Sequence, residues 1–162
     1  MGALVGCTGY QWGSRSLFRP TVRTVHVPIV RNETFRHDVG PRLTEAIVRR
    51  LQESTPYIVT GDPQADSVLT CRVVSDAKGS LTETNTDEVR ALEMVLAIEA
   101  SWVSRNGQVL MENRILPTGS IAVLFNQDAR IVPEAGQALE AEIQTAVDGL
   151  ADRIVSQMEA RW

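Results

Sequence analysis

The chain is poor in the side chains that most often carry out chemistry. Its 162 residues include two cysteines, two histidines and one lysine, and aromatic residues make up 5%. Two cysteines are too few for a disulfide scaffold or a four-cysteine zinc site, and two histidines leave little material for metal catalysis. No apolar run exceeds five residues, so the sequence predicts no membrane-spanning helix.

Motifs of known enzyme classes are absent as well. The sequence has no P-loop, no G-x-G-x-x-G and no G-x-S-x-G. Glu33, His37 and Asp38 share one connection, but no second group of ligands accompanies them. Cys71 lies in an apolar segment, which predicts a small core residue rather than a nucleophile. We therefore expect a protein that is not an enzyme and that binds no metal or cofactor.

Charge is distributed unevenly along the chain. Residues 1–50 hold eight arginines and three acidic residues, a net charge of +5, whereas residues 51–162 have a net charge of −9. The total of −4 argues against a general nucleic-acid binder. The arginines of the first part either meet an anionic partner or form an ordinary solvated surface, and the sequence leaves both readings open.

The first half of the chain predicts strands around one helix. Residues 21–30 are rich in β-branched residues, although Pro28 cannot donate to a sheet. A helix is expected to begin at Gly40-Pro41 and to end before Thr55-Pro56, with an apolar stripe every fourth residue. Two short strands, residues 57–60 and 68–74, follow it. Residues 75–88 are polar and predict a long flexible connection.

Alternating apolar and polar residues predict a half-buried strand over residues 90–102. Asn106-Gly107 then predicts a two-residue hairpin turn, which would place Glu99 opposite Arg114 and Trp102 opposite Met111. Residues 116–132 are ambiguous between an added strand and an apolar loop.

A long amphipathic helix is expected after Pro133. The whole pattern predicts an α+β fold: an antiparallel or mixed four-stranded sheet with two helices packed on one face, in the order β-α-β-β-β-α.

The N-terminus has the form of a bacterial lipobox. Residues 4–7 read Leu-Val-Gly-Cys, and a polar segment follows. Small residues before the cysteine fit the signal peptidase, and the thiol of Cys7 would receive the lipid. On this reading residues 1–20 are a lipoprotein anchor segment with a truncated signal remnant, and residues 21–162 are one domain. The alternative is an ordinary cysteine near a chain end.

Short motifs along the chain resemble the LPS-assembly lipoprotein family LptE, in the divergent form of planctomycete-type bacteria. The matching segments are residues 7–13 (CTGYQWG), 17–20 (LFRP), 22–29 (VRTVHVPI), 43–46, 55–59, 65–70 and 150–155, with Met158, Glu159 and Trp162 near the end. The strand and helix order that the family implies agrees with the order read from periodicity.

The resemblance implies a lipid-anchored protein of the outer membrane that faces the periplasm. Its partner would be an LptD-type β-barrel, which it plugs, and it would support the insertion of lipopolysaccharide into the outer leaflet. The family binds lipopolysaccharide, or a related anionic lipid, through basic residues near a hairpin tip and before the last helix, where this chain has Arg105 and Arg130.

Two other functions fit the sequence. One is a different lipid-anchored periplasmic adaptor, and the other is a soluble small-molecule-binding α+β domain. A neighbouring gene for a large outer-membrane barrel would favour the LptE-like reading over the first, and a deep polar pocket would favour the second.

Overall fold

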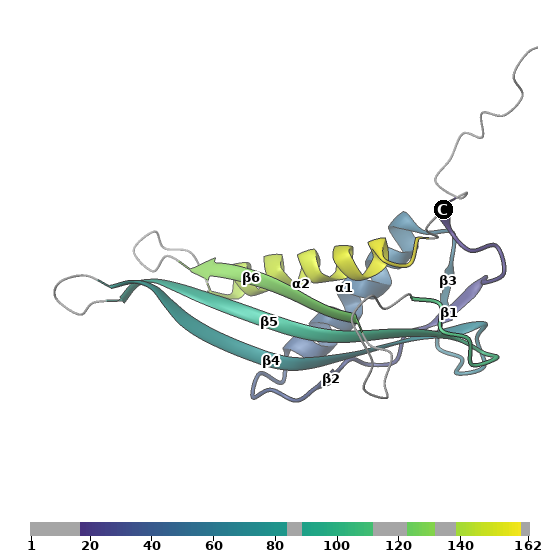
Figure 1. Ribbon diagram of the computed structural model, residues 1–162, viewed down its shortest axis with the longest axis horizontal. Helices are drawn as coiled ribbons and strands as arrows, with labels where there is room; N and C mark the ends of the chain where they lie inside the picture. Colours follow the sequence, from purple (N-terminus) through teal and green to yellow (C-terminus); the bar gives the residue numbers. More distant parts are fainter. Residues whose placement is uncertain (1–16, 84–88, 112–122, 132–138, 160–162) are drawn as a thin grey trace, which may run out of the picture.

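A computed structural model describes residues 17–83, 89–111, 123–131 and 139–159 (Figure 1). These residues form one sheet and two helices, which confirms the α+β class. The elements are β1 (Thr24–His26), β2 (Arg31–Asn32), α1 (Val39–Ser54), β3 (Ile58–Thr60), β4 (Ser67–Glu83), β5 (Val89–Ser104), β6 (Val123–Ile131) and α2 (Leu139–Ser156).

The described strands form a mixed sheet in the order β3-β1-β4-β5-β6, with β2 paired to β4 beside this path. Strand β1 runs parallel to β3 and β4, and β2 runs parallel to β4, whereas β4-β5 and β5-β6 are antiparallel. The expectation of four strands is wrong, because the sheet has six. One added strand is β2, which follows the predicted segment 21–30 after a break at Pro28, and the other is β6 in the ambiguous segment.

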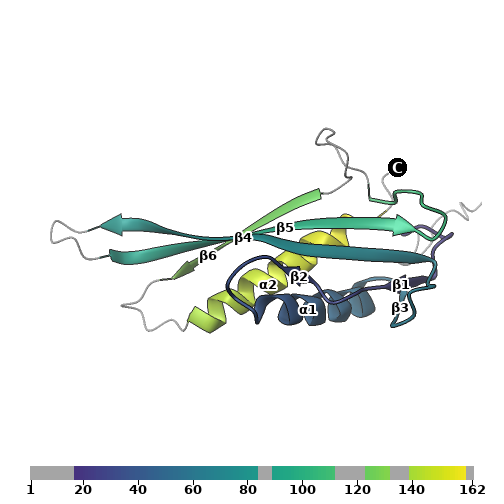
Figure 2. The same ribbon diagram turned by 90° about the horizontal axis from the view of Figure 1, so that it is seen from below.

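The connection expected over residues 75–88 is mostly strand. Strand β4 continues to Glu83, and its partner β5 begins at Val89. The two strands pair over almost their whole length, with register shifts near Val73–Ser75 and at Ser80–Glu83. The resulting hairpin is long and twisted and extends beyond both helices (Figures 1 and 2). Polar composition misled the prediction, because this part of the hairpin gains its order from backbone pairing.

The turn at Asn106-Gly107 exists, but its register differs from the prediction. Gly107 N–H donates to the Ser104 carbonyl at 2.8 Å, and Ser104 N–H donates to the Gln108 carbonyl at 2.7 Å. Gly107 has φ of 83°, so the loop has three residues with glycine in the left-handed position. Val103 therefore lies opposite Val109, whereas the predicted two-residue turn would have placed it opposite Leu110.

Farther from the turn, the Trp102 carbonyl accepts from the N–H groups of Leu110 at 2.9 Å and of Met111, the expected partner, at 3.4 Å. The expected pair of Glu99 with Arg114 is wrong. Glu99 lies between Arg72 of β4 and Leu124 of β6, so it does not pair with Arg114. Residues 112–122, which include Arg114, lie outside the described residues.

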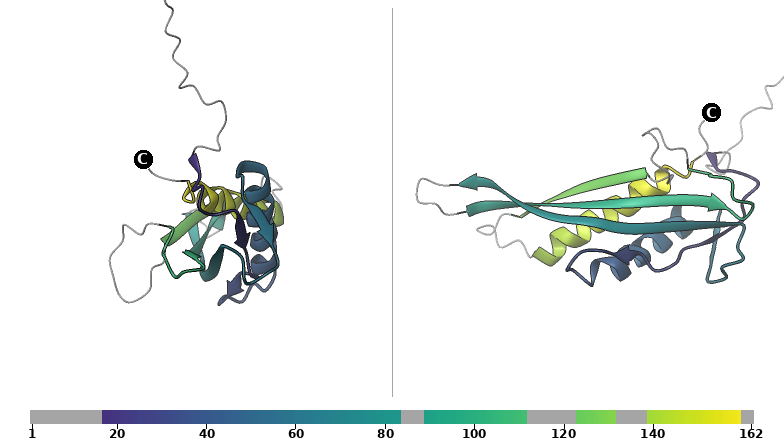
Figure 3. Two further views of the ribbon diagram at one scale, coloured as in Figure 1. Left: turned by 90° about the vertical axis from the view of Figure 1, so that its right-hand side faces the viewer. Right: turned by 60° about the horizontal axis from the view of Figure 1, so that its bottom comes forward.

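Both helices cover one face of the sheet, as expected (Figure 2; Figure 3, left). The buried side of α1 consists of Val39, Gly40, Leu43, Ala46, Ile47 and Leu51. The predicted stripe of α2 is buried from Ile143 to Ile154. Three ion pairs join the helices in the same order along both: Arg42–Glu140, Arg49–Asp148 and Arg50–Asp152. Helices α1 and α2 therefore run side by side in the same direction.

Aromatic residues fill the end of the core near β3. Trp102 is fully buried, and its ring lies 5.7 Å from that of Tyr57, which in turn meets Phe18 edge-on at 5.5 Å. Cys71 is also buried, and burial raises the pKa of its thiol to about 12. Cys71 is thus the small core residue that the sequence predicted.

Candidate functional site

The possible metal cluster near residue 37 is not assembled. The carboxylate of Glu33 accepts from Arg72 at 2.9 Å, and that of Asp38 accepts from Arg42 at 3.1 Å. His37 is exposed. In the part of the chain that the structure describes, no three His, Cys, Asp or Glu side chains gather as metal ligands would.

The predicted lipidation site, Cys7, falls in residues 1–16, outside the described residues. The described helices include none that is long and apolar enough to cross a bilayer.

Arg105 lies at the tip of the β5 hairpin, where its side chain is exposed. Its backbone N–H donates to the Asp66 carbonyl at 2.8 Å, and its guanidinium donates to Gln64 Oε1 at 3.1 Å. These contacts hold the turn against the loop before β4 and leave most of the guanidinium in solvent.

Arg130 belongs to β6, where its backbone lies opposite Glu93 of β5. Glu93 and Arg105 are twelve positions apart in sequence. At about 3.3 Å per residue this separation is about 40 Å along the strand. The structure therefore places the two arginines near opposite ends of β5 and does not bring them together.

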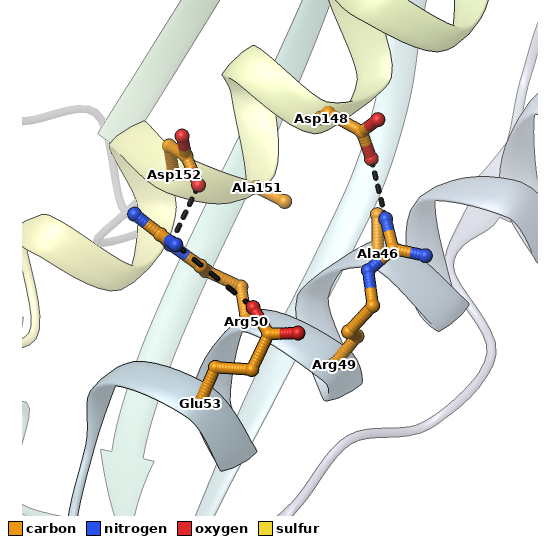
Figure 4. A pocket seen from close by; sticks show the side chains of 7 residues that line it. All are labelled: Ala46, Arg49, Arg50, Glu53, Asp148, Ala151 and Asp152. Carbon is orange, nitrogen blue, oxygen red and sulfur yellow. Dashed lines mark hydrogen bonds and ion pairs between the residues drawn. The ribbon is translucent and has the colours of Figure 1, made fainter.

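A row of ion pairs, which no sequence pattern predicted, joins the two helices (Figure 4). Arg49 of α1 lies 2.7 Å from Asp148 of α2, and Arg50 lies 2.7 Å from Asp152 and 3.9 Å from Glu53. They border a cleft of about 210 Å³. Periodicity predicted only the apolar stripe of α1, since no local pattern says which distant helix its arginines meet.

Arg42 extends this row toward the start of both helices. It donates to Glu140 at 2.7 Å and to Asp38 at 3.1 Å, and the bond to Glu140 raises the pKa of Arg42. Each arginine of the row has a carboxylate partner. The cleft is therefore lined by ion pairs that join the two helices.

A second hollow, of about 360 Å³, lies beside β3. Its lining combines apolar side chains with two arginines, Arg19 and Arg23. The sequence did not predict this hollow, because its lining joins residues 18–23 to Pro56 and Ile58, which lie beyond α1.

A mixed sheet with both helices on one face defines the chain as an α+β module. The sequence model of the LptE family, described as lipopolysaccharide-assembly, matches residues 22–158. The chain belongs to this family, as its motifs predicted. Membership also supports the expectation that it is not an enzyme, since the family consists of lipoproteins of lipopolysaccharide assembly.

Solved structures share the fold at low sequence identity. The uncharacterized lipoprotein B of Nitrosomonas europaea has a TM-score of 0.57 and 13% identity, over 91% of this chain and 88% of that one. Rare lipoprotein B of Shewanella oneidensis has a TM-score of 0.55 and 15% identity, over 84% and 93%. The hypothetical protein CT253 of Chlamydia trachomatis has a TM-score of 0.58 and 9% identity, over 84% and 95%. A search of curated proteins gave no match.

Proposed function

We propose that this chain is an outer-membrane lipoprotein that faces the periplasm and partners an LptD-type β-barrel in lipopolysaccharide transport and assembly. The match of the family model over residues 22–158 carries the proposal. Two neighbours in fold are themselves named lipoproteins, which agrees with an anchored protein. In this proposal residues 1–20 are the anchor segment and residues 21–162 are the domain.

Lipidation of Cys7 is the anchoring step of the proposal. The test expresses the chain with its native upstream sequence and compares Cys7→Ser with Cys71→Ala. Cys71 is 2% exposed and lies in the core. The Cys71→Ala variant is therefore the control, because it removes a thiol that is not accessible to lipidation. Intact mass should show the lipid on the wild type and on Cys71→Ala, and no lipid on Cys7→Ser.

Partnership with a barrel is tested by purification from detergent-extracted membranes. Mass spectrometry of the purified material should find an LptD-type barrel with the wild-type protein. Recovery of another membrane partner in its place would favour a different periplasmic adaptor. A soluble monomer with unmodified Cys7 would overturn the proposal.

Arg105 and Arg130 are proposed to contact lipopolysaccharide or a related anionic lipid. Since they lie about 40 Å apart along the sheet, they would act as separate contacts, and their effects on affinity should add. Binding of purified lipopolysaccharide is measured for Arg105→Gln, Arg130→Gln and the double variant. An unchanged affinity in the double variant would remove both residues from the proposal.

A further inference from the structure

The hollow beside β3 combines an apolar lining with positive charge. Phe18, Pro20, Pro56 and Ile58 supply the apolar surface, and Arg19 and Arg23 supply the charge. None of these described lining residues is acidic. At its rim Ile58 is 64% exposed and the neighbouring Leu17 is 36% exposed. Large apolar side chains beside arginines are typical of surfaces that meet the headgroup region of a membrane.

The walls of the hollow are fixed to the core. Phe18 packs edge-on against Tyr57, and the Arg19 N–H donates to the Tyr57 hydroxyl at 3.0 Å. The Ile58 N–H donates to the Arg23 carbonyl at 2.8 Å. The backbone that follows Leu17 is therefore held against the core.

Arg23 has the more open side chain of the two arginines. One Arg19 nitrogen donates to the Leu110 carbonyl at 3.0 Å, and the Arg19 Nε is buried. Arg23 is exposed and forms no ion pair within the described part of the chain. The carboxylate of Asp66 accepts from the backbone N–H groups of Arg23 and Thr24, each at 3.0 Å.

The number of residues between Cys7 and Leu17 limits how far this hollow can lie from the membrane. Cys7 precedes Leu17 by ten residues, which span at most about 35 Å when fully extended. If Cys7 carries the lipid, as the proposed function requires, this face of the domain cannot lie further than that from the membrane. An anionic leaflet would match the charge of the arginines.

We infer that the face formed by Leu17, Arg19, Pro20, Arg23, Pro56 and Ile58 docks on the anionic phospholipid surface that holds the anchor. Arg19 and Arg23 meet phosphate groups, while Leu17 and Ile58 enter the headgroup layer. The lipid would then fix the orientation of the domain as well as its location. This inference rests on the proposed function for the choice of membrane.

The test uses the full chain with Cys7→Ser, so that no lipid contributes. Flotation is measured with vesicles of phosphatidylethanolamine and phosphatidylglycerol, and with vesicles of phosphatidylcholine alone. Binding should require phosphatidylglycerol. An arginine near an anionic surface contributes about 1 kcal/mol, so Arg23→Gln should weaken binding about fivefold. Ile58→Ser should weaken it as well, and both positions are exposed enough for the fold to survive.

The matched control is Arg31→Gln, which removes an exposed arginine from β2. That strand pairs with β4 at Arg72, away from the β1 end, and Arg31 does not line the hollow. Its binding should equal that of the parent. Equal losses in Arg23→Gln and Arg31→Gln, or no preference for phosphatidylglycerol, would overturn the inference. Because the chain carries no lipid here, binding can succeed even if lipidation of Cys7 fails, and the two proposals are judged separately.

Discussion

Trp102 shows how one polar atom is accommodated in an apolar core. Its Nε1 donates to the hydroxyl of the fully buried Ser67 at 3.0 Å. The Ser67 hydroxyl donates in turn to the Thr24 carbonyl at 3.3 Å. Two side chains and one backbone group thus connect β5, β4 and β1 beneath the hollow.

Ser67→Ala should destabilise the protein. It leaves the buried Trp102 N–H without an acceptor, which costs about 1–3 kcal/mol. Urea unfolding followed by tryptophan fluorescence measures the loss. Ser101→Ala is the control, since its half-buried side chain points to the other face of the sheet. Equal effects of the two variants would contradict the role of this bond.

Asp66 should make stability depend on acid. The backbone N–H groups of Arg23 and Thr24 lower the pKa of this carboxyl below its usual 3.8. A carboxyl whose pKa is lower in the folded state stabilises the fold above its unfolded pKa, and the contribution disappears as the pH falls through the folded pKa. Asp66→Asn should therefore reduce stability at neutral pH and flatten its decline below about pH 4. A decline as steep as in the wild type would contradict this.

Helix α1 begins where two segments of backbone approach closely. A Cβ on Gly40 would lie 2.7 Å from the Val30 carbonyl oxygen, and the Val30 N–H is bonded to Thr44 at 2.9 Å. The connection before the helix is therefore held against its first turns. Glycine at this position permits the approach.

Gly40→Ala should lower the free energy of unfolding. Overpacking costs about 1–3 kcal/mol, whereas the gain in helix propensity returns at most about 1 kcal/mol. Gly61→Ala is the control, because a Cβ there would meet nothing within 4 Å. Thermal unfolding of the two variants measures the difference. A stabilised Gly40→Ala would show that Val30 can move away.

Elements with a regular apolar period could be predicted from the sequence. Leu43, Ile47 and Leu51 recur every four residues, and the helix that they predict is α1 almost to the residue. The second part of β4 could not be predicted, because its order comes from pairing with β5. Asn106-Gly107 predicted a turn, but left-handed glycine occurs in two- and three-residue turns alike, so the register stayed open.

Candidate sites could likewise be predicted only where their residues form a local pattern. A lipobox is a local pattern, so the sequence alone could nominate Cys7. Arg49 and Asp148 are ninety-nine residues apart, and only the tertiary fold joins them. The hollow beside β3 likewise needs Arg19 and Ile58, which the chain separates by a whole helix. Sites built from distant segments carry no local signature.

Ion pairs within the molecule compensate much of the uneven charge of the chain. Arginines of the first 50 residues meet acidic residues of the later, negative part in four ion pairs: Arg36–Asp76, Arg42–Glu140, Arg49–Asp148 and Arg50–Asp152. The positive N-terminal part therefore does not by itself indicate an anionic partner. Arg19 and Arg23 are the members of that part that line the hollow.

Salt should weaken the contact between the helices. Exposed pairs contribute at most about 1 kcal/mol each, and salt screens them. Unfolding is measured in low and high sodium chloride for the wild type and for Asp148→Asn/Asp152→Asn. The double variant should depend less on salt, whereas Glu45→Gln, an exposed residue of α1 outside these pairs, should behave like the wild type. Identical salt dependence in all three would contradict the role of the pairs.

The side-by-side packing of α1 and α2 also sets when the molecule can fold. Half of the helical layer comes from the end of the chain, and Leu150, Ile154 and Met158 are fully enclosed. A ribosome must therefore synthesise α2 before the core can close. Until then Leu43 and Ile47 have no second helix beside them. The side of the core that α1 supplies is therefore covered only after the second helix has been made.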